Sequence, residues 1–318
     1  MFPSDLNMFL MKIINAIVPV NTIILFLILI CIPEYLYSQD DLLKILEENK
    51  DESEIRYTEN TFKGSRLING HTIEVRDKGV LEFLITHRFG RLNSGAYNFF
   101  GLDEANIRLG LDYSITNKLT IGIGRSSFQK VYDGFIKYQL FRQSTGAKKT
   151  PFTLTVFGST AIKTLRSPDP DVSIPFERKL AYATQILLAR KFGERLSLQL
   201  MPTLVHRNYV ETSVEENTIF AIGVGGRIKI SKRIALTGEY YPRLNGTDPE
   251  MIYNSLSVGI DIETGGHVFQ LMFSNSRQMI EKGFITETDG KWGNGDIHFG
   301  FNISRVFYLN SKKNKEDW

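Results

Sequence analysis

The sequence contains a single cysteine, Cys31, and only two tryptophans among its 318 residues. One cysteine excludes an internal disulfide and a cysteine-based zinc site. The formal net charge is only +3, so the chain lacks the strongly basic balance of a nucleic-acid-binding protein. We therefore expect no nucleic-acid partner, no metal and no cofactor.

Recognisable catalytic motifs are also missing. The histidines do not have the helical spacing of a zinc protease, and no Gly-x-Ser-x-Gly sequence marks a hydrolase nucleophile. The five histidines are His71, His87, His206, His267 and His298. No catalytic residue is predicted, although a serine and a histidine brought together from different strands stay open as an alternative.

One long apolar run, residues 13–32, follows the basic residue Lys12 and precedes the small residue Ser38. This order is typical of a secretory signal, and we predict a signal peptide over residues 1–38 and a mature chain from Gln39. The candidate start residues are Met1, Met8 and Met11, of which we favour the last. The alternative is a retained membrane anchor, because the run approaches the length that spans a bilayer.

Residues 39–79 form an N-terminal segment whose structure the sequence leaves open. An acidic stretch at residues 41–49 has the apolar spacing of a short helix. The stretch from 55 to 79 scatters apolar residues among polar ones. An extra strand, a periplasmic cover and an insert in a barrel lumen are all compatible with it.

From Val80 onward, apolar and polar residues alternate with a period of two, as in β-strands. The clearest run ends the pattern, where Phe299, Phe301 and Ile303 alternate with Gly300 and Asn302. The predicted strands are residues 80–88, 105–114, 119–128, 132–142, 152–165, 180–191, 196–206, 219–230, 234–241, 254–263, 268–275 and 296–307. Most match the roughly 9–11 residues with which a tilted strand crosses a bilayer.

The connections between these strands alternate in length. Short turns are expected at residues 115–118, 192–195, 231–233 and 264–266, and long loops at 89–104, 166–179, 207–218, 242–253 and 276–295. Segments 143–151 and 129–131 blur the pattern. Short turns inside and long loops outside are typical of outer-membrane barrels, so we expect loops 166–179 and 276–295 to face the outside.

We therefore predict an all-β fold: a single transmembrane antiparallel up-and-down β-barrel of about twelve strands over residues 80–309, with a charged tail at 310–318. A soluble barrel is the alternative, because it also alternates but turns its apolar face inward. The 22 phenylalanines and 13 tyrosines suit the interfacial girdles of a membrane barrel. Accordingly, an arginine at Leu198 should be costly and one at Gln199 nearly tolerated.

Glycines and charges fall on the face assigned to the lumen. Gly122, Gly124, Gly223 and Gly225 lack the third glycine of a nucleotide-binding motif and are expected to relieve crowding inside the barrel. The predicted lumen-lining residues are Glu82, Arg88, Arg108, Asp112, Lys137, Lys163, Arg227, Lys229, Glu239, Asp261 and Glu263. Burying unpaired charges is costly, so we predict a mutually paired lining of both signs. A paired closed lumen and a selective pore both stay open.

Several short motifs carry a family resemblance. They include Leu67-Ile-Asn-Gly-His71, Thr86-His-Arg-Phe-Gly90, Gln143-Ser-Thr-Gly-Ala147, Glu263-Thr-Gly-Gly-His-Val-Phe-Gln270 and Gly295-Asp-Ile-His-Phe-Gly-Phe301. Together they resemble an uncharacterised family of bacterial outer-membrane β-barrel proteins, known as a domain of unknown function. The resemblance covers residues 62–309 and implies a barrel in the outer membrane. It implies no substrate, catalytic residue or cofactor.

The working hypothesis is an outer-membrane barrel that passes or binds a small polar solute. One alternative is a lipid-facing or loop-borne hydrolase, and another is a closed structural or partner-docking barrel. The expected partners are outer-membrane lipid and the barrel-assembly machinery, and the oligomeric state is left open.

Overall fold

The computed structural model describes residues 53–309 except 167, 168, 170–172, 211, 213, 214, 247–251, 265 and 266. The predicted signal peptide, the acidic stretch 41–49 and the tail 310–318 lie outside these residues. None of the helices in the described part of the chain is long and apolar enough to cross a membrane.

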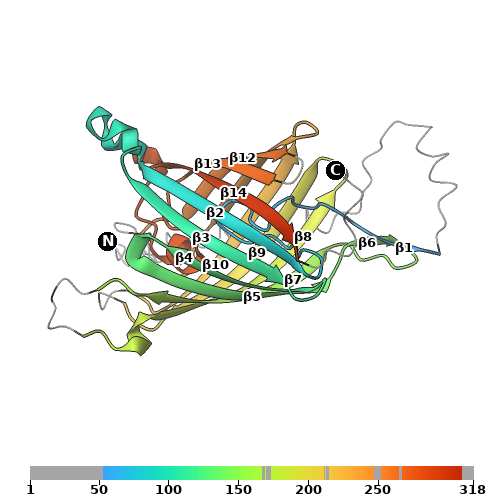
Figure 1. The fold of residues 1–318 in the computed structure, drawn as a ribbon, viewed down its shortest axis with the longest axis horizontal. Coiled ribbons are helices and arrows are strands. Elements are labelled where there is room, and N and C mark those ends of the chain that lie inside the picture. Colours follow the sequence, from blue (N-terminus) through green and yellow to red (C-terminus); the bar gives the residue numbers. More distant parts are fainter. Residues whose placement is uncertain are drawn as a thin grey trace, which may run out of the picture.

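In the described residues, twelve antiparallel strands form a closed barrel, which confirms the predicted fold class (Figure 1). Each strand pairs with its neighbours along the chain, and the last strand pairs with the first. The strands are β2 (Val80–Arg91), β3 (Ala105–Ser114), β4 (Leu119–Ser126), β5 (Val131–Phe141), β7 (Thr153–Lys163), β8 (Leu180–Phe192), β9 (Leu196–Arg207), β10 (Thr218–Lys229), β11 (Ile234–Tyr241), β12 (Ser255–Thr264), β13 (His267–Ser274) and β14 (His298–Tyr308). Closure leaves no unpaired sheet edge within the barrel.

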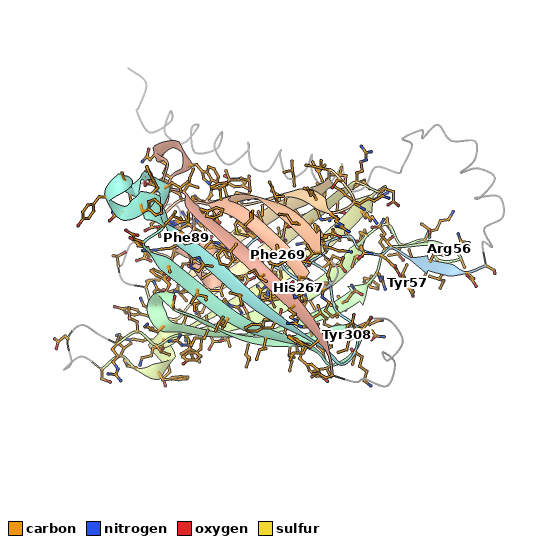
Figure 2. All side chains as sticks on the ribbon, turned by 45° about the horizontal axis from the view of Figure 1, so that its top comes forward. Arg56, Tyr57, Phe89, His267, Phe269 and Tyr308 are labelled. Atoms are coloured by element: carbon orange, nitrogen blue, oxygen red, sulfur yellow. The ribbon has the colours of Figure 1, made fainter. Side chains whose placement is uncertain are left out.

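The two faces of the strands have the polarity of a membrane barrel. In β14, the side chains of His298 and Asn302 are buried, whereas Phe299 and Phe301 on the outer face are only half-buried. On β4, Ile123 is 65% exposed on the outer face. Phe89 and Phe269 also lie on the outer surface (Figure 2). A soluble barrel would bury these side chains, so the outer surface suits lipid and is that of a transmembrane barrel.

A small two-stranded sheet projects from the end of the barrel where the short turns lie (Figure 1). It pairs β1 (Ile55–Tyr57) with β6 (Ser144–Gly146). This pairing explains why the connection at residues 143–151 is longer than the other turns. The remaining short elements are η1 (Leu92–Ser94), η2 (Ala96–Gly101), η3 (Phe128–Lys130), η4 (Phe176–Lys179), α3 (Glu281–Thr286) and η5 (Trp292–Asn294).

Glycines make room for large side chains inside the barrel, as predicted. A methyl group on Gly122 would overlap the ring of Phe135, and one on Gly223 would overlap the ring of Tyr241. Both rings belong to a buried apolar cluster that fills part of the lumen. The barrel therefore has a packed interior, in contrast to the water-filled lumen of a large porin.

Candidate functional site

The N-terminal insert, residues 58–79, follows β1 and fills part of the lumen. Phe62, Leu67, Ile68 and Ile73 are each at most 2% exposed. The chain reverses between Leu67 and Gly70, where the Leu67 amide donates to the Gly70 carbonyl over 2.8 Å. Of the three structures that the sequence left open for residues 55–79, a short strand outside the barrel and a lumen insert are both present.

Polar side chains of the barrel wall hold this insert by its backbone. The Glu239 carboxylate accepts hydrogen bonds from the amides of Asn69 (2.8 Å) and Gly70 (3.1 Å). Asn302 donates to the Ile68 carbonyl over 2.8 Å. Gln199 accepts from the Ile73 amide over 2.9 Å. A buried irregular backbone needs such partners, and the wall supplies them from several strands.

This role corrects the expectation that an arginine at Gln199 would be tolerated. The Gln199 side chain is fully buried and also donates to the His71 carbonyl over 2.8 Å. A larger charged side chain would break both hydrogen bonds and displace the N-terminal insert. The structure therefore predicts that an arginine at position 199 is costly, because the lumen at this depth is packed.

A second insert enters the lumen from the opposite end. This β13–β14 insert, residues 275–297, contains α3, whose residues are all buried. The Phe284 ring packs against Tyr241 with centroids 4.9 Å apart. The prediction that loop 276–295 faces the outside stays a prediction. The structure shows that this loop leaves the barrel at the end of the long loops and that its part at α3 turns back into the lumen. Its apolar residues lower their free energy by packing inside the barrel.

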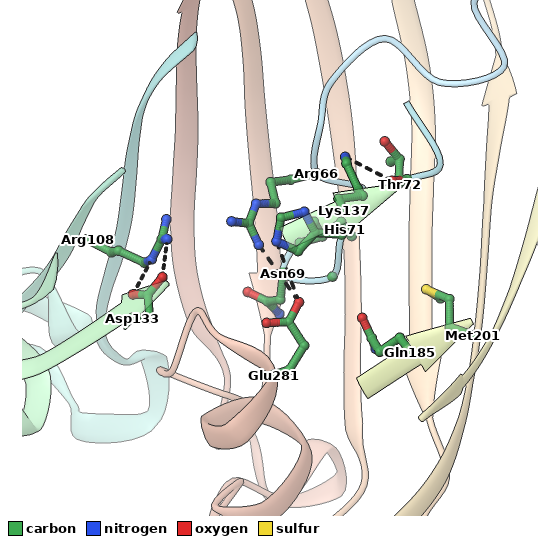
Figure 3. A network of polar contacts seen from close by, with 12 residues as sticks. Arg66, Asn69, His71, Thr72, Arg108, Asp133, Lys137, Gln185, Met201 and Glu281 are labelled. Carbon is green, nitrogen blue, oxygen red and sulfur yellow. Dashed lines mark hydrogen bonds and ion pairs between the residues drawn. The ribbon is translucent and has the colours of Figure 1, made fainter. Parts of the chain in front are cut away.

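The two inserts meet at a central cluster of Arg66, His71, Glu281, Arg108 and Asp133 (Figure 3). The Glu281 carboxylate lies 3.8 Å from Arg66 Nη1 and 3.9 Å from His71 Nε2. Burial raises the pKa of the Glu281 carboxyl to about 7, with Arg66 opposing the shift. Burial lowers the pKa of His71 well below its usual value, so His71 is neutral at pH 7.

The void beside this cluster is about 10 Å³, scarcely enough for one water molecule. It is bordered by Phe135 and Phe157, whose rings flank His71 at centroid distances of 4.5 and 4.3 Å. The described residues thus close the middle of the lumen in this structure.

The structure buries most of the charged residues assigned to the lumen. Glu82, Arg88, Arg108, Asp112, Lys137, Arg227, Glu239 and Asp261 are at most 7% exposed, and Lys163, Lys229 and Glu263 are half-buried. Several of them bind the N-terminal insert instead of the opposite wall. Arg88 donates to Asn69 over 2.7 Å, Lys137 donates to the Thr72 carbonyl over 3.2 Å, and Glu82 accepts from Arg76 over 2.9 Å.

Among the described residues, direct pairing within the wall includes two places. Arg108 Nε donates to Asp133 over 2.9 Å and not to Asp112, whose carboxylate oxygens have no hydrogen-bond partner among the described residues. The reason is Gly124, which stands between the two strands and leaves space for the Arg108 guanidinium. At the second place, Arg227 Nε lies 3.5 Å from Asp261, and Arg227 also binds Glu263.

Four members of the central cluster, Asp133, Arg66, His71 and Glu281, were not among the predicted lumen-lining residues. Asp133 has the same strand parity as Lys137, so the alternating pattern contained the signal that places it in the lumen. Arg66, His71 and Glu281 belong to irregular inserts. No periodicity predicts where such segments lie, because only tertiary packing decides it.

An external vestibule of about 800 Å³ opens at the end of the long loops. Its lining comes from the ends of β7, β8, β9 and β10, from η4, from the β11–β12 connection and from the β13–β14 insert. Lys282 of α3 lines the vestibule, whereas the adjacent Glu281 faces the other insert. The β13–β14 insert therefore separates the vestibule from the central cluster.

Cationic side chains outnumber acidic ones in the vestibule. The described lining residues include seven cations: Lys163, Arg178, Lys179, Arg207, Arg243, Arg277 and Lys282. They include four carboxylates: Glu215, Glu216, Glu287 and Asp289. A concave site with an excess of one sign raises the local concentration of the opposite charge.

The described residues give the hydrolase alternative no geometric support. His206 Nδ1 shares a 2.8 Å hydrogen bond with Thr218, and His298 Nδ1 bonds the Phe89 carbonyl over 2.8 Å. No serine–histidine hydrogen bond occurs in this part of the chain. The same residues contain no cluster of three or more metal-ligating side chains.

Solved structures with a related arrangement include outer-membrane channels. The COG4313 outer membrane channel from Pseudomonas putida F1 has 13% identity and a TM-score of 0.41, covering 74% of this chain and 98% of that one. The CymD monoaromatic hydrocarbon channel has 7% identity and a TM-score of 0.34, covering 73% and 90%. None of the curated proteins matches the sequence.

Residues 62–307 match the family described as a membrane-bound β-barrel domain (DUF5777). The match spans most of the chain and coincides with the N-terminal insert and the whole barrel. The architecture, the lipid-facing surface and this match agree, and the chain belongs to the DUF5777 family of membrane-bound β-barrels.

Proposed function

We propose that the protein is a gated outer-membrane channel for a small polar solute, closed in this structure and opened when the β13–β14 insert withdraws towards the outside. The observation that carries the proposal is the position of α3. It forms the floor of the vestibule with Lys282 and blocks the lumen with Glu281.

The contacts of this insert support its role as the moving part. Many of its polar bonds are internal: the Thr286 hydroxyl donates to the Lys282 carbonyl over 2.6 Å, and Thr288 donates to the Phe284 carbonyl over 2.7 Å. Lys282 and Gln278 both bind Glu287 within the same insert. The part of the insert around α3, which satisfies its own polar groups in this way, can leave the lumen at a lower cost than a segment that depends on the wall. The rest of the insert stays bonded to the barrel rim at Tyr253 and Leu256.

A cross-linking experiment tests the proposal. Cys31 is replaced by serine, and cysteines are introduced at Gln129 and Glu287, whose side chains touch at 3.3 Å. A short reducible thiol cross-linker then ties the insert to the η3 loop. We expect channel openings in planar bilayers to stop on cross-linking and to return on reduction.

The matched control ties the other insert. Arg142 Nε donates to the Thr58 backbone carbonyl over 3.2 Å at the exposed start of the N-terminal insert. Cysteines at these two positions should leave openings unchanged after cross-linking. Openings that persist in the Gln129/Glu287 pair, or stop only in the control pair, would show that the gate lies elsewhere.

The packed lumen favours a second candidate, a closed barrel that docks a partner. The β1–β6 sheet projects from the barrel and leaves Ile55 and Tyr57 exposed (45% and 52%). If the parent protein and every variant give no conductance, this candidate replaces the channel.

A further inference from the structure

The external vestibule has the size and charge of a ligand site. Its volume of about 800 Å³ is within the range of small-molecule sites. Its walls come from separate parts of the barrel rim, so side chains distant in the sequence converge on one space.

Three of the four described carboxylates of the vestibule are paired with cations, and the fourth, Glu216, accepts a hydrogen bond from Asn245. Glu215 binds Arg207 over 2.9 Å, and Glu287 binds Lys282. Asp289 lies 3.0 Å from Arg91, which is outside the vestibule lining, and 3.7 Å from Arg277. These carboxylates therefore offer little to a cationic solute.

Some cations of the vestibule remain available. Within the described chain, neither Arg178 nor Lys179 of η4 pairs with a carboxylate. The Arg178 guanidinium lies over the Tyr209 ring at 5.4 Å, and the Arg277 guanidinium lies over the Phe128 ring at 4.2 Å. An aromatic ring holds a guanidinium plane in place without using its N–H donors, and the 3.7 Å between Arg277 and Asp289 is longer than a hydrogen bond. Such a preorganised fork matches the two oxygens of a carboxylate or phosphate.

We infer that the vestibule binds a small solute that carries two or more carboxylate or phosphate groups, with Arg178 and Arg277 as its principal contacts. The excess of cations requires more than one anionic group for neutralisation, and the two guanidinium groups come from separate elements, η4 and the β13–β14 insert. This inference rests on the proposed channel for its physiological meaning, but the binding step is testable without conductance.

Calorimetric titration of the purified full-length protein in a neutral detergent tests the inference. The probes are citrate and inorganic phosphate as anions, maltose as a neutral solute and spermidine as a cation. We expect citrate to bind more tightly than phosphate, and its affinity to fall with added salt. Maltose and spermidine should show no comparable binding.

The variant Arg178→Gln with Arg277→Gln should weaken citrate binding at least about tenfold, because two charge-assisted contacts are lost. The control Lys118→Gln with Lys232→Gln removes two exposed cations from the turns at the opposite end of the barrel and should bind citrate like the parent. A thermal unfolding midpoint equal to that of the parent verifies that the double variant is folded. Equal citrate affinity in the parent and Arg178/Arg277 variant, or equal affinity for maltose, would overturn the inference.

The same anionic chemistry is present in the phosphates of lipopolysaccharide. Repeating the titration in nanodiscs with and without lipopolysaccharide separates the two sources. Citrate binding that is unaffected assigns the site to a free solute, and competition assigns it to the lipid phosphates. Citrate binding without conductance would remove the channel but keep the anion site, whereas conductance without citrate binding would do the reverse.

Discussion

The two segments that fill the lumen are held in different ways. The N-terminal insert gives its backbone to the wall: Glu239, Gln199 and Asn302 bond its amides and carbonyls directly. The β13–β14 insert is folded on itself and packs through Phe284 and Ile285, both fully buried. The proposed gating depends on this difference: the wall fixes the backbone of the N-terminal insert, whereas the β13–β14 insert is held in the lumen mainly by packing.

The largest expected effect comes from removing an anchor of the N-terminal insert. Glu239→Ala leaves the amides of Asn69 and Gly70 buried without an acceptor, and we expect a loss of about 2–5 kcal/mol in the free energy of unfolding. The measurement is urea unfolding of the folded barrel in detergent.

Glu194→Ala, in the exposed turn between β8 and β9, is the matched control and should cost almost nothing. A loss of stability as small in Glu239→Ala as in this control would show that the insert is not anchored by the wall, and the contrast between the inserts would disappear.

An intermediate effect concerns pH and the β13–β14 insert. Burial raises the pKa of Glu281 to about 7 from an ordinary value of 4.5. The groups facing it are Arg66 and His71 on the N-terminal insert and Arg108 and Asp133 on the wall. Between these two pH values, the closed form holds a proton that an open, solvated Glu281 releases. Closure is therefore favoured at low pH and weakens as the pH rises.

We expect the ratio of open to closed channels to rise by up to about tenfold per pH unit between about 4.5 and 7, and then to level off. Single-channel recordings over this range provide the measurement. Glu281→Gln should flatten the profile and keep the channel closed, whereas Asp289→Asn at the exposed rim should leave it unchanged. A channel that opens as the pH falls would contradict this account.

The smallest effect is expected at Asp261. In the mutually paired lining that the sequence predicts, Asp261→Asn would leave a basic partner unpaired, lower stability and shift selectivity towards anions. In the structure Arg227 also binds Glu263, so it keeps a carboxylate partner in the variant. We now expect a smaller loss of stability than in Glu239→Ala, because an asparagine side chain keeps an oxygen that can accept from Gln270 (2.9 Å), and almost no change in reversal potential. A large change in either quantity would mean that Asp261 is the principal partner of Arg227.

The strand pattern was readable from the sequence to within a few residues. The predicted bounds 105–114 and 234–241 coincide with β3 and β11. The strands could be predicted from alternation alone, with apolar residues on one face and small, polar and charged residues on the other. A strand that crosses a bilayer must present an apolar face to lipid. The β1–β6 sheet was missed, since its three-residue strands are too short to show a period.

The sequence predicted the lumen-lining residues only in part. The period of two put Glu82, Lys137 and Glu239 on the inner face, where they are buried. The period of two did not predict the hydrogen-bonding or ion-pair partner of any of these residues, because partners depend on which strand lies across the barrel and on what fills the lumen. Arg108 reaches Asp133 only because Gly124 intervenes without a side chain.

The sequence by itself determined the barrel, its lipid-facing surface and the polarity of its interior, because these follow from local alternation and loop length. Only the tertiary structure decided that the interior is filled, that residues 58–79 and the β13–β14 insert meet at Glu281, and that cations converge on the vestibule. Irregular segments carry no periodicity, and their positions follow from which buried backbone groups and apolar side chains find partners inside the closed barrel.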